Sequence, residues 1–226
     1  MLALKLGLSL NTIHPYGEWA PDGDANLVAW YANKRGITAP SATVSQWADS
    51  SGNGHLMKNV TVTEQPSYNV STGALSFDAS KTQNLQTASQ ISLTGVFTIG
   101  LKLNPDAVNI TILGDNTTSG EFIKIQTSNK LRIKIDNTQA DISLNSGSFG
   151  DDYLVITRNS SNVITLYQNG TAQTDTETLS GTADIDNIGV RSTDQNPYDG
   201  DIKEIQIYNK ENSVLTTNVN NYLANL

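Results

Sequence analysis

The stretch Val44–Leu56, VSQWADSSGNGHL, places a tryptophan just before an acidic residue, two serines and an alternation of glycine and asparagine. Three interpretations are open for it: a catalytic loop, a metal-binding loop, or the bend between two strands of a sandwich. Asp and Ser side chains bond local backbone N–H groups, and Gly adopts the positive φ angles of tight turns. In the third interpretation, Trp47 ends a strand as part of the core and anchors the sheet edge.

Short segments on both sides of this stretch alternate apolar and polar residues, which predicts strands with one buried and one solvated face. The segments 121–127 (EFIKIQT) and 130–136 (KLRIKID) predict a hairpin. Asn169 and Gly170 supply the positive φ angles of a type I′ hairpin turn. A helical pattern then follows, which Ser213 can cap and whose apolar face holds Leu215, Val219, Tyr222 and Leu223.

The composition excludes several classes of function. The chain has 226 residues and a net charge of −8, and an acidic surface repels phosphate backbones, so nucleic-acid binding is disfavoured. It has no cysteine, which removes disulfides, thiol catalysis and cysteine-based zinc sites. Two histidines cannot form a multi-histidine metal centre, whereas carboxylate and amide oxygens are abundant, so calcium is the one metal to consider.

The first ten residues, MLALKLGLSL, carry leucine at strict period two, which indicates a strand and not a signal peptide. No segment approaches the length of a transmembrane span, so no membrane partner is expected. A loop rich in Pro, Gly and Asp follows, and strand patterns then continue without a break in composition. We therefore predict two parts: an N-terminal arm and loop, 1–26, as a candidate assembly anchor, and one β domain, 27–226.

Four sets of motifs follow one another along the β domain. They are LVAWYANKRGI with VSQWADSSGNGHLMKN (27–59), ALSFDASKTQNLQT (74–87), YLVITRNSSNVITLYQNGT (153–171) and IGVRSTDQNPYDGDIKEIQIYNK (188–210). In this order and spacing they resemble the concanavalin A-like, laminin G-type jelly roll. The resemblance implies an all-β fold: a two-sheet antiparallel jelly-roll sandwich with a short C-terminal helix and an N-terminal extended arm.

The resemblance also implies a metal site. Family members often hold a structural calcium ion near the loop after the tryptophan, completed by a carboxylate from the closing strand. Carried over to this chain, the calcium ligands are Asp49, Asn53 and Glu204, with backbone carbonyls. For Asp49 we favour the other interpretation, a turn in which its side chain bonds local backbone N–H groups.

Catalysis on glycans needs paired carboxylates that face each other across a cleft. Sandwich glucanases of this superfold place Glu, Asp and Glu on one face of a strand, at i, i+2 and i+5. The nearest string here is Glu204, Gln206 and Asn209, in which amides replace two of the three carboxylates. Because neither a nucleophile nor a proton donor has a candidate, we expect that the protein is not an enzyme and has no catalytic residue.

Two groups of residues are candidates for binding a partner. A sugar site needs an aromatic platform beside planar hydrogen-bonders, and the loop 193–201 offers Asn196, Tyr198 and Asp199 as glycan contacts; of the two interpretations we favour a plain connecting loop. The alternating leucines of the arm suit β-augmentation of a neighbour's sheet edge. Trp19, in the polar loop, either stacks on a sugar or docks into a neighbouring subunit, and we favour docking. The expected assembly contacts are Leu2, Leu4, Leu6, Leu8, Leu10 and Trp19.

Two functions follow from these features. The leucine-alternating start directly before the module is similar to single-domain bacteriophage virion structural proteins. This similarity implies a non-enzymatic protein at the virion surface, either a head decoration or cement protein or a tail or fibre component. Its partners would be other virion proteins and copies of itself in a homo-oligomer, with host surface glycans as a further ligand. The alternative is a lectin-like carbohydrate-binding module that recognises extracellular or cell-surface glycans.

Overall fold

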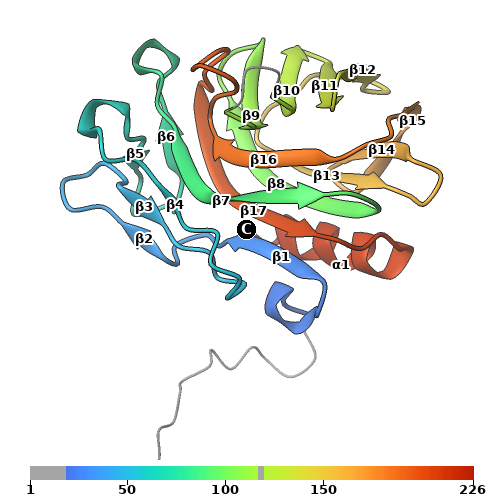
Figure 1. The fold of residues 1–226 in the computed structure, drawn as a ribbon, viewed down its shortest axis with the longest axis horizontal. Helices are drawn as coiled ribbons and strands as arrows, with labels where there is room; N and C mark the ends of the chain where they lie inside the picture. The colour runs from blue at the N-terminus through green and yellow to red at the C-terminus, as the bar shows by residue number, and fades with distance from the viewer. Residues whose placement is uncertain (1–18, 117–119) are drawn as a thin grey trace, which may run out of the picture.

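The structure, a computed structural model, describes residues 19–116 and 120–226. In this part of the chain, two antiparallel sheets pack face to face, and a helix covers the outer face of one of them (Figure 1). The predicted two-sheet antiparallel sandwich with a C-terminal helix is therefore confirmed. The leucines from Leu2 to Leu10 lie outside the described residues, so their role in assembly stays a prediction.

Sheet A has eight strands, and its closing strand β17 (Gly200–Tyr208) lies at its centre. One edge of β17 pairs with β8 (Phe97–Pro105). The other edge is shared by β1 (Leu27–Tyr31) and β6 (Leu75–Phe77). The sheet continues beyond β6 with β5 (Ser67–Tyr68), and beyond β8 with β13 (Asp152–Arg158), β14 (Val163–Gln168) and β15 (Thr171–Thr178).

Sheet B has nine strands, and its central strand β16 (Ala183–Ile188) lies between β9 and β7. Its order from one edge is β12 (Thr138–Ser143), β11 (Lys130–Ile135), β10 (Phe122–Thr127), β9 (Ile110–Gly114), β16, β7 (Leu85–Leu93), β4 (Met57–Lys58), β3 (Gln46–Trp47) and β2 (Ile37–Thr38). Three short 3₁₀ turns interrupt the loops, at Pro21–Gly23, Val62–Glu64 and Ala79–Lys81.

The main core fills the space between the two sheets with aliphatic side chains from alternate strand positions. Trp47 belongs to it: the side chain is fully buried, its ring centroid lies 5.7 Å from that of Tyr31, and its indole N–H donates to the carbonyl of Ala32 at 3.2 Å. Gly52 and Gly54 both adopt φ +87° in the bend that follows. The opening stretch is thus a structural corner anchored by its tryptophan, as the third interpretation predicts.

Local sequence signals are confirmed where they concern neighbouring residues. The strands β10 and β11 pair as a hairpin, and Asn169 and Gly170 join β14 to β15 with φ +50° and +79°. The helix α1 (Ser213–Ala224) begins one residue earlier than predicted, because the side chain of Asn212, and not that of Ser213, accepts the N–H of Leu215 at 2.8 Å.

The helix α1 packs on the outer face of sheet A through Leu215, Val219 and Leu223. Gly100 on β8 permits this approach, because a Cβ at that position would lie 2.6 Å from a methyl carbon of Val219. Within the described residues, no helix is both long and apolar enough to cross a membrane.

Trp19 belongs to the same layer as the helix. Its ring centroid lies 6.3 Å from that of Tyr208 and 6.2 Å from that of Tyr222, so it docks on its own domain. The ring finds apolar partners in the aromatic layer beneath α1, and its docking into a neighbouring subunit stays a prediction.

Arg158 at the end of β13 is fully buried, and burial lowers the pKa of its guanidinium. The group donates to the carbonyl oxygens of Gly95, Leu93 and Gly181, and it stacks 4.8 Å from the ring of Phe97. These contacts tie the turn between β7 and β8 to the loop that precedes β16. A single cation therefore joins segments of both sheets at this end of the sandwich.

Replacing Arg158 with methionine keeps an unbranched apolar stem but removes the guanidinium, which leaves these buried carbonyl groups without donors. We expect Arg158→Met to lower the free energy of unfolding by about 3–5 kcal/mol, as measured by urea unfolding. Arg158→Lys is the control: it keeps the charge but has fewer donors, so it should lose less stability than Arg158→Met. A loss below about 1 kcal/mol for Arg158→Met would contradict the proposed role.

Candidate functional site

A groove of 440 Å³ lies on the outer side of sheet B. Its floor is formed by β4 and β7, one wall by the segment that follows β4, and the other by the loops that follow β9 and β16. Polar side chains predominate among its lining residues, which are Lys58, Asn59, Val60, Glu64, Asn84, Gln86, Thr87, Ala88, Asn116 and Asp194. None of the described residues that line the groove is aromatic.

A break in strand register shapes the floor of this groove. Ile185 pairs with Ile91, and Asn187 pairs with Gln86, so the four residues from Thr87 to Gln90 lie opposite Asp186 alone. The extra residues make β7 bulge out of the regular ladder. Bulges of this kind are frequent next to functional sites. Thr87 and Ala88, which line the groove, belong to this departure.

Asp186 fixes two of the lining residues from below. One carboxylate oxygen accepts the backbone N–H of Asn116 at 2.9 Å, and the other accepts the side-chain amide of Gln86 at 3.4 Å. Burial raises the pKa of Asp186, and the neighbouring carboxylates of Asp115 and Asp184 raise it further, against the effect of these hydrogen bonds. The acid therefore holds the backbone of Asn116 and the side-chain amide of Gln86 in place.

Asn59 holds the opposite wall in place. Its side-chain amide donates to the backbone carbonyl of Asn84 at 3.1 Å, and its side-chain oxygen accepts the N–H of Thr61 at 2.8 Å. The side-chain amide of Gln65 donates to the backbone carbonyl of Asn59 at 2.7 Å. The backbone N–H of Asn84 donates to the backbone carbonyl of Glu64 at 2.9 Å. Because protein contacts already orient these groups, little side-chain entropy is lost when a ligand binds.

The loop 193–201, which the sequence singles out for sugar binding, contributes to the groove through Asp194 only. Asn196 is engaged elsewhere: its side-chain oxygen accepts the guanidinium of Arg191 at 2.9 Å. Tyr198 is fully buried, edge-on to Phe77, so it is a core residue and cannot serve as a surface platform. Asp199 is half-buried, and its carbonyl accepts the N–H of Asp106 at 2.9 Å.

The residues predicted to bind calcium surround Trp30. Asp49 accepts the backbone N–H of Trp30 at 3.0 Å, and Glu204 accepts its indole N–H at 2.5 Å. Asn53 presents its amide group to the carbonyl oxygens of Leu27 and Val28, at 2.9 Å each. Trp30 therefore joins the corner loop to the closing strand, between the two carboxylates.

Protein donors occupy every carboxylate oxygen of this set. The oxygens of Asp49 also accept the backbone N–H groups of Ser51 and His55 and the hydroxyl of Ser51. The second oxygen of Glu204 accepts the N–H of Asn33 at 2.5 Å. Calcium needs several oxygens directed at one point, so this arrangement does not fit an ion held by Asp49, Asn53 and Glu204. The described residues contain no cluster of three or more metal-ligating acids or histidines.

Glu204 is completely buried, which raises its pKa to about 7 although Trp30, Asn33 and Gln206 donate hydrogen bonds to it. Its folded pKa lies above the unfolded value near 4.5, so its stabilising contribution is complete below pH 4.5 and is lost as the pH rises through 7. Its strand neighbour Gln206, the next residue of the glucanase-like string, is also fully buried. Neither side chain reaches the groove.

We expect the free energy of unfolding of the wild-type protein to fall, relative to Glu204→Gln, by about 3 kcal/mol between pH 4.5 and pH 8. The variant is the reference because an amide does not titrate, whatever its constant effect on stability. Urea unfolding across this range measures the difference. Parallel pH profiles for the two proteins would show that Glu204 does not titrate there.

Asp49→Ala removes an acceptor that four protein donors share. We expect a loss of about 2–4 kcal/mol in the free energy of unfolding, equal in calcium chloride and in EDTA. Thermal unfolding of both proteins in both solutions tests this. A calcium-dependent rise in the wild-type midpoint that Asp49→Ala abolishes would restore the metal interpretation.

Solved structures share this fold at low sequence identity. The binding domain of Paraclostridial Mosquitocidal Protein 1 superposes with a TM-score of 0.57 at 18% identity, over 90% of this chain and 52% of that chain. The W1252A mutant of HCR D/C VPI 5995 gives 0.56 at 16% identity, over 90% and 53%. The Ruminococcus gnavus IT-sialidase CBM40 bound to α2,3-sialyllactose gives 0.43 at 14% identity, over 55% and 82%.

The chain spans about half the length of the first two structures, and the likeness at these identities concerns the fold. No curated protein matches the chain. A family model, described as the concanavalin A-like lectin/glucanases superfamily, matches residues 77–215, from β6 to the first turn of α1. This match covers more than half of the sequence. The chain belongs to the concanavalin A-like lectin/glucanases superfamily.

Proposed function

We propose that this protein is a non-catalytic, lectin-like module that binds a carbohydrate in the groove over β4 and β7. The observation that carries the proposal is the set of polar side chains along the groove, in which protein hydrogen bonds hold the amides of Asn59, Asn84 and Gln86 in place. The superfamily, which is named for lectins and glucanases, supports it, as does the superposition on the binding domain of Paraclostridial Mosquitocidal Protein 1.

A carbohydrate fits this groove because its hydroxyl groups both donate and accept hydrogen bonds. Gln86, Asn116 and Asn84 supply amides, which do the same, and Glu64 and Asp194 supply acceptors. Lys58 adds a donor, and the exposed methyl groups of Val60 offer an apolar contact. The volume of 440 Å³ lies within the range of roughly 300–1,000 Å³ that small-ligand sites occupy.

The non-catalytic part of the proposal is supported by the position of Glu204. It is the one carboxylate of the glucanase-like string, and it is buried against Trp30, away from the groove. The competing enzyme interpretation requires Glu64 and Asp194, the two carboxylates of the groove, as a catalytic pair. Polysaccharide hydrolysis that both Glu64→Gln and Asp194→Asn abolish would favour that interpretation.

The virion interpretation depends on the N-terminal arm and stays a prediction. Its leucines lie outside the described residues, and Trp19 packs on its own domain. A virion protein can also bind a glycan through this groove, so the two functions are compatible. Particle association that is unchanged after deletion of residues 1–18 would speak against an anchor in the arm.

A glycan array identifies the ligand, and titration calorimetry with the best glycan then tests the groove. We expect Gln86→Ala to weaken binding about tenfold, because one hydrogen bond in a preoriented site contributes about 1–1.5 kcal/mol. Gln46→Ala is the matched control: Gln46 is exposed on the outer side of sheet B, faces Lys58 in the ladder and does not line the groove.

The control variant should bind as the wild-type protein does. Equal affinities of the wild-type protein and Gln86→Ala for the array ligand would place the binding site elsewhere. An array without any bound glycan would overturn the proposed function.

A further inference from the structure

A second pocket, of 250 Å³, lies on the other sheet, between α1 and the hairpin of β13 and β14. We propose that it binds a neutral pyranose sugar, at a site separate from the groove on sheet B. The lining residues that carry the proposal are Tyr153, Tyr167, Ser213, Thr217, Asn220 and Asn221.

Two tyrosines on neighbouring strands form the aromatic side of the pocket. Tyr167 on β14 pairs with Val155 on β13, and Tyr153 lies two residues before Val155 on the same strand. Side chains two residues apart on a strand point to the same side, so both rings lie on one face of sheet A. Both rings are half-buried against the layer beneath α1. Half-buried aromatic rings beside polar groups suit a pyranose, because one sugar face is apolar and its rim carries hydroxyl groups.

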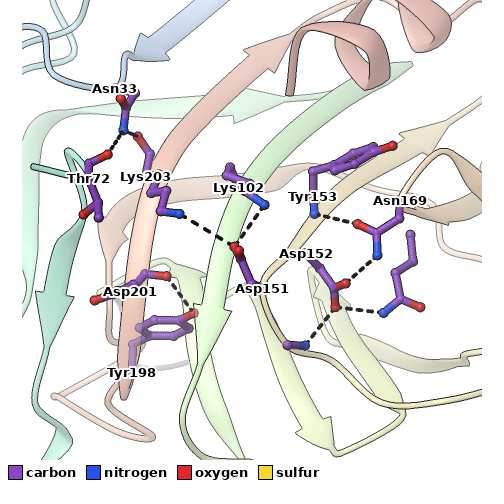
Figure 2. A network of polar contacts seen from close by, with 12 residues as sticks. Asn33, Thr72, Lys102, Asp151, Asp152, Tyr153, Asn169, Tyr198, Asp201 and Lys203 are labelled. Atoms are coloured by element: carbon purple, nitrogen blue, oxygen red, sulfur yellow. Dashed lines mark hydrogen bonds and ion pairs between the residues drawn. The ribbon is translucent and has the colours of Figure 1, made fainter. Parts of the chain in front are cut away.

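Hydrogen bonds around Asp152 hold this side of the pocket rigid. Asn169 accepts the N–H of Tyr153 at 3.1 Å and donates its amide to Asp152 at 2.6 Å, as Figure 2 shows. Asp152 also accepts the side chain of Gln168 and the N–H of Gly150, each at 2.8 Å. The turn that follows Tyr167 is therefore fixed before a ligand arrives.

The helix contributes an amide whose oxygen has no partner. Asn220 is 8% exposed; its amide nitrogen donates to the carbonyl of Thr216 at 2.9 Å, and its side-chain oxygen receives no hydrogen bond. An unsatisfied buried acceptor costs about 1–3 kcal/mol, which a donated hydroxyl would offset. The oxygen is closed off from solvent, so a ligand hydroxyl can bond it only if a neighbouring side chain moves aside.

The character of the lining selects the class of ligand. Its polar groups are hydroxyls and amides, and no charged side chain is among the described residues that line it. An acidic sugar would find no cation here, whereas a neutral sugar finds donors and acceptors in Ser213, Thr217 and Asn221. Because the two sites lie on different sheets, one chain could hold two glycan strands at once, which raises avidity without new contacts.

The test uses the whole chain, labelled with ¹⁵N, and follows side-chain amide signals during titration with glucose, galactose, mannose and glucuronic acid. We expect at least one of the neutral sugars to shift the amide signals of Asn220 and Asn221, and glucuronic acid to leave them unchanged. Thr217→Arg, at an exposed helix position that lines the pocket, should weaken this binding at least tenfold.

Two further variants separate this site from the groove. Val214→Arg is the matched control, since Val214 is 68% exposed on the same helix and does not line the pocket. Both Val214→Arg and Gln86→Ala should retain the shifts. Because the two sites are tested with different variants, a negative result at one site does not affect the test of the other. Shifts that persist in Thr217→Arg, shifts caused equally by glucuronic acid, or no shift with any neutral sugar would overturn the second site.

Discussion

The buried contact between Glu204 and Trp30 joins the two ends of the domain. The residues lie 174 positions apart, and the same tryptophan bonds Asp49 through its backbone, so one residue links the first strand, the corner loop and the closing strand. A carboxylate in the core is costly unless it is hydrogen-bonded, and three donors surround this one. The residue that resembles the first carboxylate of the glucanase string thus links the first strand to the closing strand here.

Features that depend on neighbouring residues could be predicted from the sequence. Apolar alternation predicted the hairpin of β10 and β11, and Asn169 with Gly170 predicted the turn after β14, since both signals act over a few residues. The predicted helix start was wrong by one position. Asn212 and Ser213 are both good N-cap residues, and only the backbone geometry decides between them. The anchoring role of Trp47 followed from its place before a turn.

The candidate site could not be predicted in the same way. Its side chains come from β4, β7 and the loops after β9 and β16, and they meet because β7 leaves the ladder opposite Asp186. No local pattern marks such a break in register. Tyr198 shows the same difficulty: an aromatic residue in a polar loop suggests a surface platform for a sugar, yet this loop turns its ring inward onto Phe77, as suits a plain connecting loop.

The central place of β17 in sheet A has a consequence for how the chain folds. Three strands, β1, β6 and β8, hydrogen-bond to a segment that ribosomes synthesise after all three of them and after β9 to β16. Sheet A cannot close before that segment emerges, and the pairing of β1 with β17 spans most of the chain. High contact order of this kind slows folding and leaves strand edges unpaired during synthesis.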